Sequence, residues 1–342
     1  MTFGETTGRA IDAEIERQVK IVADDRDRVI LDLQNRLVDA LEEIEQLRNP
    51  APEPQDLLLI GAAWNNNTSG TDGVQEAAQI PYDAVRIYAK DSSVAERDKM
   101  VALIEEHGAA GVKHVVVSFK PPRSWSDMAA GLADPWIRAT AKAVSDAAVA
   151  AGVTVWLIIS HEPENDTGTN NGKSDAGQAA WKAFQSHAGQ LIKGKYPSTL
   201  FGPCLMGYHS QPKVSSSKWW LLERCIPVMD VDFVFFDPYE DSTNVPAIAK
   251  LLGDFCKANG LISGFAEYGI KKGDYSGDPT QMDKTVAACR INGLRLLAYF
   301  NTQATNTNNP DPATSYAMEQ GGPRFKNWVA ILKAKKTLTI TH

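Results

Sequence analysis

Short apolar runs recur along this chain, and patterns typical of helices separate them. Eight such runs lie at Leu57–Ala63, Ala84–Ala89, Val112–Phe119, Val153–Ser160, Thr199–Met206, Val231–Phe236, Ile262–Ala266 and Leu294–Phe300. Runs of this kind are typical of parallel strands that are buried on both faces. Helical patterns fill the spaces at Val94–His107, Trp136–Ala151, Ala176–Lys193, Val245–Asn259 and Thr280–Asn292. Their number and order predict an α/β fold, a (β/α)8 TIM barrel over residues 56–342.

A doubly wound open sheet is the competing architecture. Sheets of that kind often carry a GxGxxG or P-loop motif directly after a strand, where the loop cradles a phosphate. Neither motif follows any of the eight runs. The barrel is therefore the preferred prediction.

The first 48 residues have a different composition and predict a helical coiled coil. They are rich in charged residues, and one apolar stripe alternates steps of three and four through Ile30, Leu33, Leu37, Ala40, Ile44 and Leu47. This spacing is the a/d seam of a coiled coil, and Ile at a with Leu at d favours a dimer. Arg26 on the seam and a phase slip near Ile30 leave dimer and trimer open. The alternative is an amphipathic helix that docks on its own barrel.

Residues 49–55 contain three closely spaced prolines and predict a stiff linker. The expected organisation is a stalk at 1–48, a linker at 49–55 and a barrel at 56–342.

Composition narrows the possible function classes. The net charge of −7 and the pI near 5.5 argue against a nucleic-acid binder. No apolar run approaches the roughly 20 residues that span a bilayer, and the N-terminus lacks a signal-peptide pattern, so we expect synthesis in a cytoplasm without membrane insertion. We expect neither a metal site nor a cofactor, because no histidine cluster occurs and no zinc-ligand spacing joins Cys204, Cys225, Cys256 and Cys289.

Two glutamates stand where predicted strands end. Glu162 follows the fourth run and Glu267 follows the seventh. In a barrel the carboxyl ends of all strands share one active-site mouth, so we expect the two carboxylates to meet. A pair of this kind suits glycoside hydrolysis, in which one carboxyl is the acid/base and the other the nucleophile. Arg86 and the Tyr239 hydroxyl would hold Glu267 ionised, while a partly apolar cleft would raise the pKa of Glu162.

The residues at these strand ends resemble the clan A glycoside hydrolases, especially glycoside hydrolase family 26. The similarity rests on His161-Glu162, on Glu267-Tyr-Gly, on Arg86 in Val-Arg-Ile-Tyr and on Asp237-Pro-Tyr239. It implies retaining chemistry with Glu162 as acid/base, Glu267 as nucleophile, and His161, Arg86, Asp237 and Tyr239 in support. For Asp237 a structural role, capping the turn after the strand, is equally open.

Aromatic residues on the expected loops are candidates for contacts with sugar rings. Trp64 and Trp125 are such candidates, with packing in the core as the alternative for each; Tyr299 is a further candidate in the cleft, and His209 is a candidate at its rim. The aromatic residues that family 26 has just after its His-Glu motif are absent here, and the strand-eight Trp is replaced by Tyr299 or Phe300, which departs from the mannanase pattern.

A glycosidase-like barrel on a helical stalk resembles a phage minor tail protein. We expect a virion tail or tail-tip location, self-association through the stalk, contact with other tail proteins, and binding or cleavage of a host surface polysaccharide. Three alternatives stay open: a cytoplasmic oligomeric glycosidase, a catalytically silent carbohydrate-binding barrel, and a structural tail component.

Overall fold

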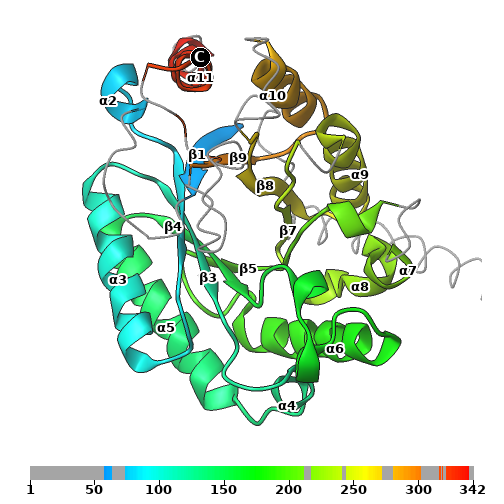
Figure 1. The fold of residues 1–342 in the computed structure, drawn as a ribbon. Coiled ribbons are helices and arrows are strands. Elements are labelled where there is room, and N and C mark those ends of the chain that lie inside the picture. Colours follow the sequence, from blue (N-terminus) through cyan, green and yellow to red (C-terminus); the bar gives the residue numbers. More distant parts are fainter. Residues whose placement is uncertain are drawn as a thin grey trace, which may run out of the picture. The chain divides into compact units, whose positions relative to one another are not determined.

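The structure is a computed structural model that describes residues 58–63, 74–211, 217–240, 244–271, 280–301, 316, 318 and 321–338 (Figure 1). The predicted stalk at 1–48, the linker at 49–55 and Trp64 lie outside the described residues. Within the described ranges, no helix is long and apolar enough to cross a membrane.

One parallel sheet curls through the molecule and forms its centre (Figure 1). Its strands are β1 Leu59–Ala63, β2 Ala84–Tyr88, β3 His114–Phe119, β4 Thr154–Ile159, β5 Thr199–Phe201, β6 Cys204–Leu205, β7 Phe233–Phe236, β8 Ile262–Tyr268 and β9 Leu296–Phe300. The hydrogen-bonded order is β5-β4-β3-β2-β1-β9-β8-β7-β6. All eight predicted runs coincide with strands, and the sheet resembles a (β/α)8 barrel.

Helices surround the curled sheet on its outer side (Figure 1). They are α2 Val74–Ala78, α3 Val94–Ala109, α4 Trp125–Ala129, α5 Asp134–Ala151, α6 Asp175–Ile192, α7 Ser217–Trp220, α8 Leu222–Cys225, α9 Val245–Ala258, α10 Gln281–Ile291 and α11 Pro323–Leu338. Local sequence sets several ends: Ser93, Ser174 and Asn244 cap their helices with side-chain oxygens, and Gly152 ends α5 in the left-handed region.

The predicted fifth strand is divided into β5 and β6, and the sequence explains the division. Pro203 has no N–H to donate to a neighbouring strand, and a Cβ on Gly202 would lie 2.2 Å from the Phe233 carbonyl oxygen. Both pieces still connect the sheet, because β5 pairs with β4 and β6 pairs with β7. The Asp232 N–H also donates to Phe201 O at 2.8 Å, so backbone bonds link β5 directly to the segment before β7.

Two apolar clusters fill the two sides of the sheet. The larger lies between strands and helices. The smaller fills the barrel interior, where the Trp156 ring of β4 packs 4.9 Å from Phe235 of β7. Because side chains alternate along a strand, Ala84 of the inner cluster puts Arg86 and Tyr88 on the same interior face.

An open groove of about 1050 Å³ lies between α6 and α9, beside α8 and the 3-10 turn Val228–Asp230. It is lined by residues such as Lys182, Met229 and Phe255. It shares no residue with the carboxylate cluster described next.

Candidate active site

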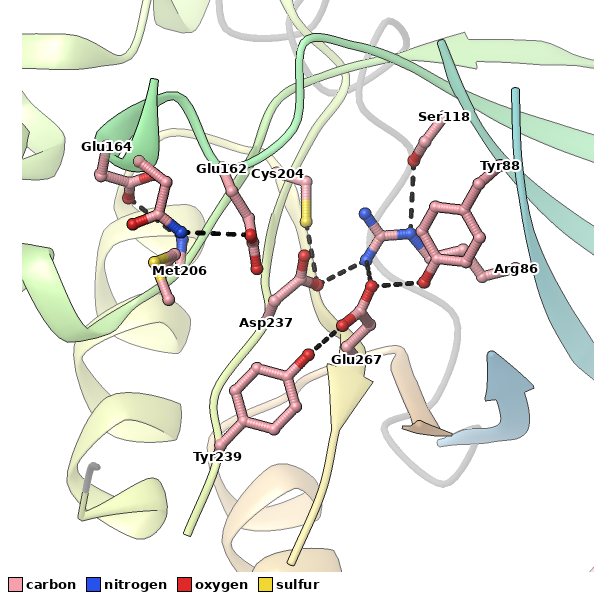
Figure 2. A network of polar contacts seen from close by, with 11 residues as sticks. Arg86, Tyr88, Ser118, Glu162, Glu164, Cys204, Met206, Asp237, Tyr239 and Glu267 are labelled. Carbon is pink, nitrogen blue, oxygen red and sulfur yellow. Dashed lines mark hydrogen bonds and ion pairs between the residues drawn. The ribbon is translucent and has the colours of Figure 1, made fainter. Parts of the chain in front are cut away.

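Three carboxylates meet at the carboxyl ends of β4, β7 and β8. One oxygen from each of Glu162, Asp237 and Glu267 lies within 4.8 Å of the others. Glu162 follows β4, Asp237 follows β7 and Glu267 is the last residue but one of β8. Three different strands therefore bring these carboxylates to one point (Figure 2). Asp237 is fully buried and Glu267 is 4% exposed, whereas Glu162 is half-buried. The two predicted glutamates are therefore brought together.

A bulge in β8 turns Glu267 into the barrel. Phe265 pairs with Leu297 and Tyr268 pairs with Tyr299. Between these pairs β8 therefore contains one more residue than β9. Phe265 and Tyr268 both face the helices, and Ala266 belongs to the inner cluster. Strict alternation from Phe265 would have pointed Glu267 outward. The extra residue lets it follow Ala266 inward, as bulges near active sites commonly do.

Three donors hold the Glu267 carboxylate in one orientation. Arg86 Nη1 lies 3.2 Å from Oε1, the Tyr88 hydroxyl also bonds Oε1, and the Tyr239 hydroxyl bonds Oε2 (Figure 2). Both tyrosines remain neutral donors, because burial first, and then the Glu267 charge, raise their pKa values.

Arg86 lies on β2 and connects the carboxylates of Asp237 and Glu267. Its Nη1 lies 2.6 Å from Asp237 Oδ1, and its Nε donates to Ser118 Oγ at 3.3 Å. Burial alone would lower the pKa of Arg86, but Asp237 and its other neighbours outweigh burial and raise it. Arg86 is therefore a permanent buried cation that faces both Asp237 and Glu267.

The environment of the Glu162 carboxyl group differs from that of Glu267. Burial raises its pKa well above the usual value, and the charges of Asp237 and Glu267 add to the increase. The Asn165 side-chain amide donates to Glu162 Oε2 at a long 3.4 Å. Asp237 lies between the two glutamates: burial raises its pKa to about 7 against the lowering effect of Arg86. The site thus combines one carboxylate held by three donors with one carboxyl whose pKa is raised by burial and by its acidic neighbours.

The backbone that carries Glu162 is strained. Ser160 has φ 65° and Glu162 has φ 50°, values that residues other than glycine adopt at a cost of about 1–3 kcal/mol. The Glu162 N–H donates to Cys204 O at 2.9 Å, and Trp125 Nε1 donates to Ser160 Oγ at 3.1 Å. These contacts hold a turn that aims the Glu162 side chain at the cluster.

His161, between the two strained residues, is neutral. Burial lowers its pKa to about 3, helped by the charges of Arg86 and Lys120. Its ring centroid lies 5.8 Å from that of Tyr88. The structure places it beside the cluster as a hydrogen-bonding group without a charge.

The prediction of a sugar contact is wrong for two aromatic residues. Trp125 is 1% exposed and Tyr299 is fully buried, so neither offers a face to a sugar ring. Trp125 instead supports the strained turn, and its backbone N–H bonds Asn170 Oδ1. The Tyr299 hydroxyl donates to Tyr316 O at 3.1 Å and packs on the helix side of β9.

His209 was the residue predicted at the rim of the cleft. It follows β6 in a short 3-10 turn and is half-buried, and its ring contacts that of Tyr208, which is 36% exposed. Burial lowers the pKa of His209 below its usual value. Its role at the rim of the cleft stays a prediction.

Sequence reasoning missed the roles of Tyr88 and Cys204, and for Glu164 it left a supporting position and an exposed one open. Tyr88 could have been found, because it stands two residues after Arg86 and so shares its face. Cys204 donates its thiol to Asp237 Oδ1 at 3.1 Å, but nothing in the sequence marks it. Glu164 is fully buried although it follows a proline in an expected loop.

The three carboxylates are also where a cation would find oxygen ligands among the described residues. Arg86 already places its positive charge against Asp237 and Glu267, which opposes a metal ion at the same point. The expectation of no metal and no cofactor stays a prediction.

No family model and no curated protein sequence matches the chain. Solved structures with a similar fold include a family 26 β-mannanase from Bacteroides ovatus, with 14% identity and a TM-score of 0.58, covering 82% of this chain and 90% of that one. A fungal β-1,4-galactanase shares 13% identity with a TM-score of 0.57, over 81% and 99% of the two chains. A Cellulomonas fimi endo-β-1,4-mannanase shares 16% identity with a TM-score of 0.55, over 81% and 71%. At identities this low, the structural similarity shows a shared fold.

Proposed function

We propose that this protein is a retaining glycoside hydrolase in which Glu162 is the acid/base and Glu267 the nucleophile. The contrast between the two carboxyl groups carries the proposal. Three donors fix Glu267, including the cation Arg86, while burial and neighbouring negative charges raise the pKa of Glu162. Two titratable groups whose environments differ in this way define an acid and a base.

The separation of the two groups supports retention. Retaining enzymes hold their carboxyl groups about 5–5.5 Å apart, whereas inverting enzymes need roughly 6.5–9.5 Å for a water molecule. Oxygens of Glu162 and Glu267 lie within 4.8 Å of each other. An approach this close favours direct attack by a carboxylate over attack by an intervening water.

The proposed reaction has two steps. Glu267 attacks the anomeric carbon while Glu162 protonates the departing glycosidic oxygen, which gives a covalent glycosyl-enzyme. Glu162, now ionised, takes a proton from water, and that water releases the sugar from Glu267 with retained configuration. Tyr88, Tyr239 and Arg86 keep the Glu267 oxygens aligned with the attacked carbon. Neutral His161 is placed to donate to a sugar hydroxyl.

The substrate that we propose is a polysaccharide. The similar structures are named as enzymes for β-1,4-linked mannan and galactan. Their identity of 13–16% to this chain leaves the sugar to experiment. A panel of β-1,4-linked polysaccharides, with products followed by NMR from the first minutes, tests both claims. Released sugars with retained configuration support the proposal; inverted sugars contradict it.

Glu162→Ala is expected to slow hydrolysis by about 10²–10⁴-fold on substrates with poor leaving groups, because their oxygen needs a proton as it departs. Aryl glycosides with acidic leaving groups should lose far less in their first step. Measuring kcat/KM across leaving groups of rising pKa checks this, and the dependence should be steeper than in the wild-type protein. Equal losses on all leaving groups would remove Glu162 from the acid role.

We also propose the stalk and tail roles. They are supported by the heptad spacing of Ile30 to Leu47 and by the proline-rich linker. Several barrels on one stalk would bind a repetitive glycan with raised avidity. Light scattering at micromolar concentration should give a dimer or trimer for the full chain and a monomer for residues 56–342. A monomeric full chain would contradict self-association.

A further inference from the structure

Glu164 is a buried carboxyl group that the proposed reaction does not use. It lies on the 3-10 turn Pro163–Asn165, two residues after Glu162, and its side chain is fully buried. Its Oε1 accepts a hydrogen bond from the Met206 N–H at 3.0 Å (Figure 2). Its Oε2 is buried and has no hydrogen-bond partner among the residues that the structure describes. One oxygen is thus held and the other is not.

The groups that face Glu164 do not favour a charge there. Glu162, Asp166 and Asp237 are acidic, and the Cys225 thiol is kept neutral because burial raises its pKa. The donors that reach Glu164 are the backbone N–H groups of Met206 and of Glu164 itself. A buried carboxylate without a cation costs more than a neutral carboxyl with one unpaired oxygen. In agreement, burial raises the pKa of Glu164 to about 8.

The position of Glu164 matters because the turn before it is strained. A strained backbone persists only where its surroundings hold it in place. Gly172 packs against this turn so closely that a Cβ would lie 1.9 Å from Pro163 O, and Trp220 Nε1 bonds Gly172 O at 2.8 Å. The bond from the Met206 N–H to Glu164 adds a side-chain link between this turn and the end of β6, beside the backbone bond from the Glu162 N–H to Cys204 O.

We propose that Glu164 is a positioning residue which, as the neutral acid, fixes the turn that carries Glu162 against the end of β6. This inference rests on the proposed function, because the role of the turn is to aim the acid. Glu164 does not touch the substrate; it acts through the backbone that orients Glu162.

The protonation state is tested by melting temperature against pH for the wild-type protein and Glu164→Gln. Below about pH 4.5 the unfolded and folded forms both keep the proton. Between about 4.5 and 8 only the unfolded form loses it, so the wild-type protein should lose stability relative to Glu164→Gln as pH rises. Above about 8 the difference should become constant. Glu105→Gln, on the exposed face of α3, is the control and should follow the wild-type curve.

Parallel curves for wild type and Glu164→Gln would show that Glu164 is ionised in the folded protein and would overturn the proposal. This measurement requires no hydrolysis. If no glycan is cleaved, the proposed function fails while the melting curves still decide the state of Glu164.

The positioning role is tested by comparing Glu164→Leu with Glu164→Gln. Leucine removes the acceptor for the Met206 N–H, so kcat should fall on the order of 10- to 100-fold with little change in KM. Glutamine keeps an acceptor and should recover most of the loss. Its alkaline limb in the pH–rate profile should stay in place; a shift to lower pH would mean that a negative charge had been removed beside Glu162. A folded Glu164→Leu with undiminished kcat would overturn the positioning role.

Discussion

Glu267→Ala is expected to lower turnover by at least on the order of 10⁴-fold, because losing a nucleophile removes the covalent route itself. Glycan binding should persist, since the other cleft residues remain. Initial rates on the most active polysaccharide of the panel, together with the affinity for its oligosaccharides, measure both effects.

A small anion makes this test specific. In Glu267→Ala, azide or formate can occupy the vacated space and attack the anomeric carbon from the same side, giving a product of inverted configuration. In Glu162→Ala, azide should act on the glycosyl-enzyme instead and give a retained glycosyl azide. Exchange of these two outcomes would require the roles to be exchanged. Binding without hydrolysis by the wild-type protein would favour the silent carbohydrate-binding barrel.

Arg86→Met is expected to destabilise the fold by about 3–5 kcal/mol, because it leaves buried carboxylates without their cation. The guanidinium is fully buried, 2.6 Å from Asp237 and 3.2 Å from Glu267. For a domain of this size the loss corresponds to a fall in melting temperature of roughly 5–10 °C. Calorimetry or thermal circular dichroism at neutral pH measures it.

Two further variants, a control and a double variant, test whether a lower melting temperature comes from the lost ion pairs. Arg138→Met, on the exposed side of α5, should melt near the wild-type temperature. Adding Asp237→Asn to Arg86→Met should restore part of the stability, because the second change removes one of the stranded charges. If Arg86→Met melts within about 1 °C of wild type, the ion pairs contribute far less than their burial indicates.

Much of the fold was predictable because the interior strands are apolar on both faces. The eight predicted runs all coincide with strands, and Pro203 even marks where one of them divides. The meeting of Glu162 and Glu267 followed from the shared mouth of a parallel barrel. These features depend on local composition and on a topology rule, both of which one sequence contains.

The remaining features depend on packing that no local pattern records. Trp125 and Tyr299 were expected in the cleft, but burial depends on which neighbours arrive from distant segments. The bulge in β8 was invisible because one inserted residue leaves no mark in an apolar run. Glu164 is buried in a turn against which Gly172 packs from later in the chain, and Trp220 Nε1 bonds Gly172 O.

The split between β5 and β6 gives the barrel a seam. Proteins open locally where the backbone bonds are weakest, and at this point the Gly202 N–H donates to Leu157 O at a long 3.3 Å while Pro203 has no N–H to donate. The Glu162 amide bonds across to Cys204, directly beside the interruption. A transient opening there would move the acid relative to the nucleophile while the apolar core stays closed. We therefore expect heating to separate Glu162 from Glu267, and so to abolish the proposed activity, before it unfolds the barrel.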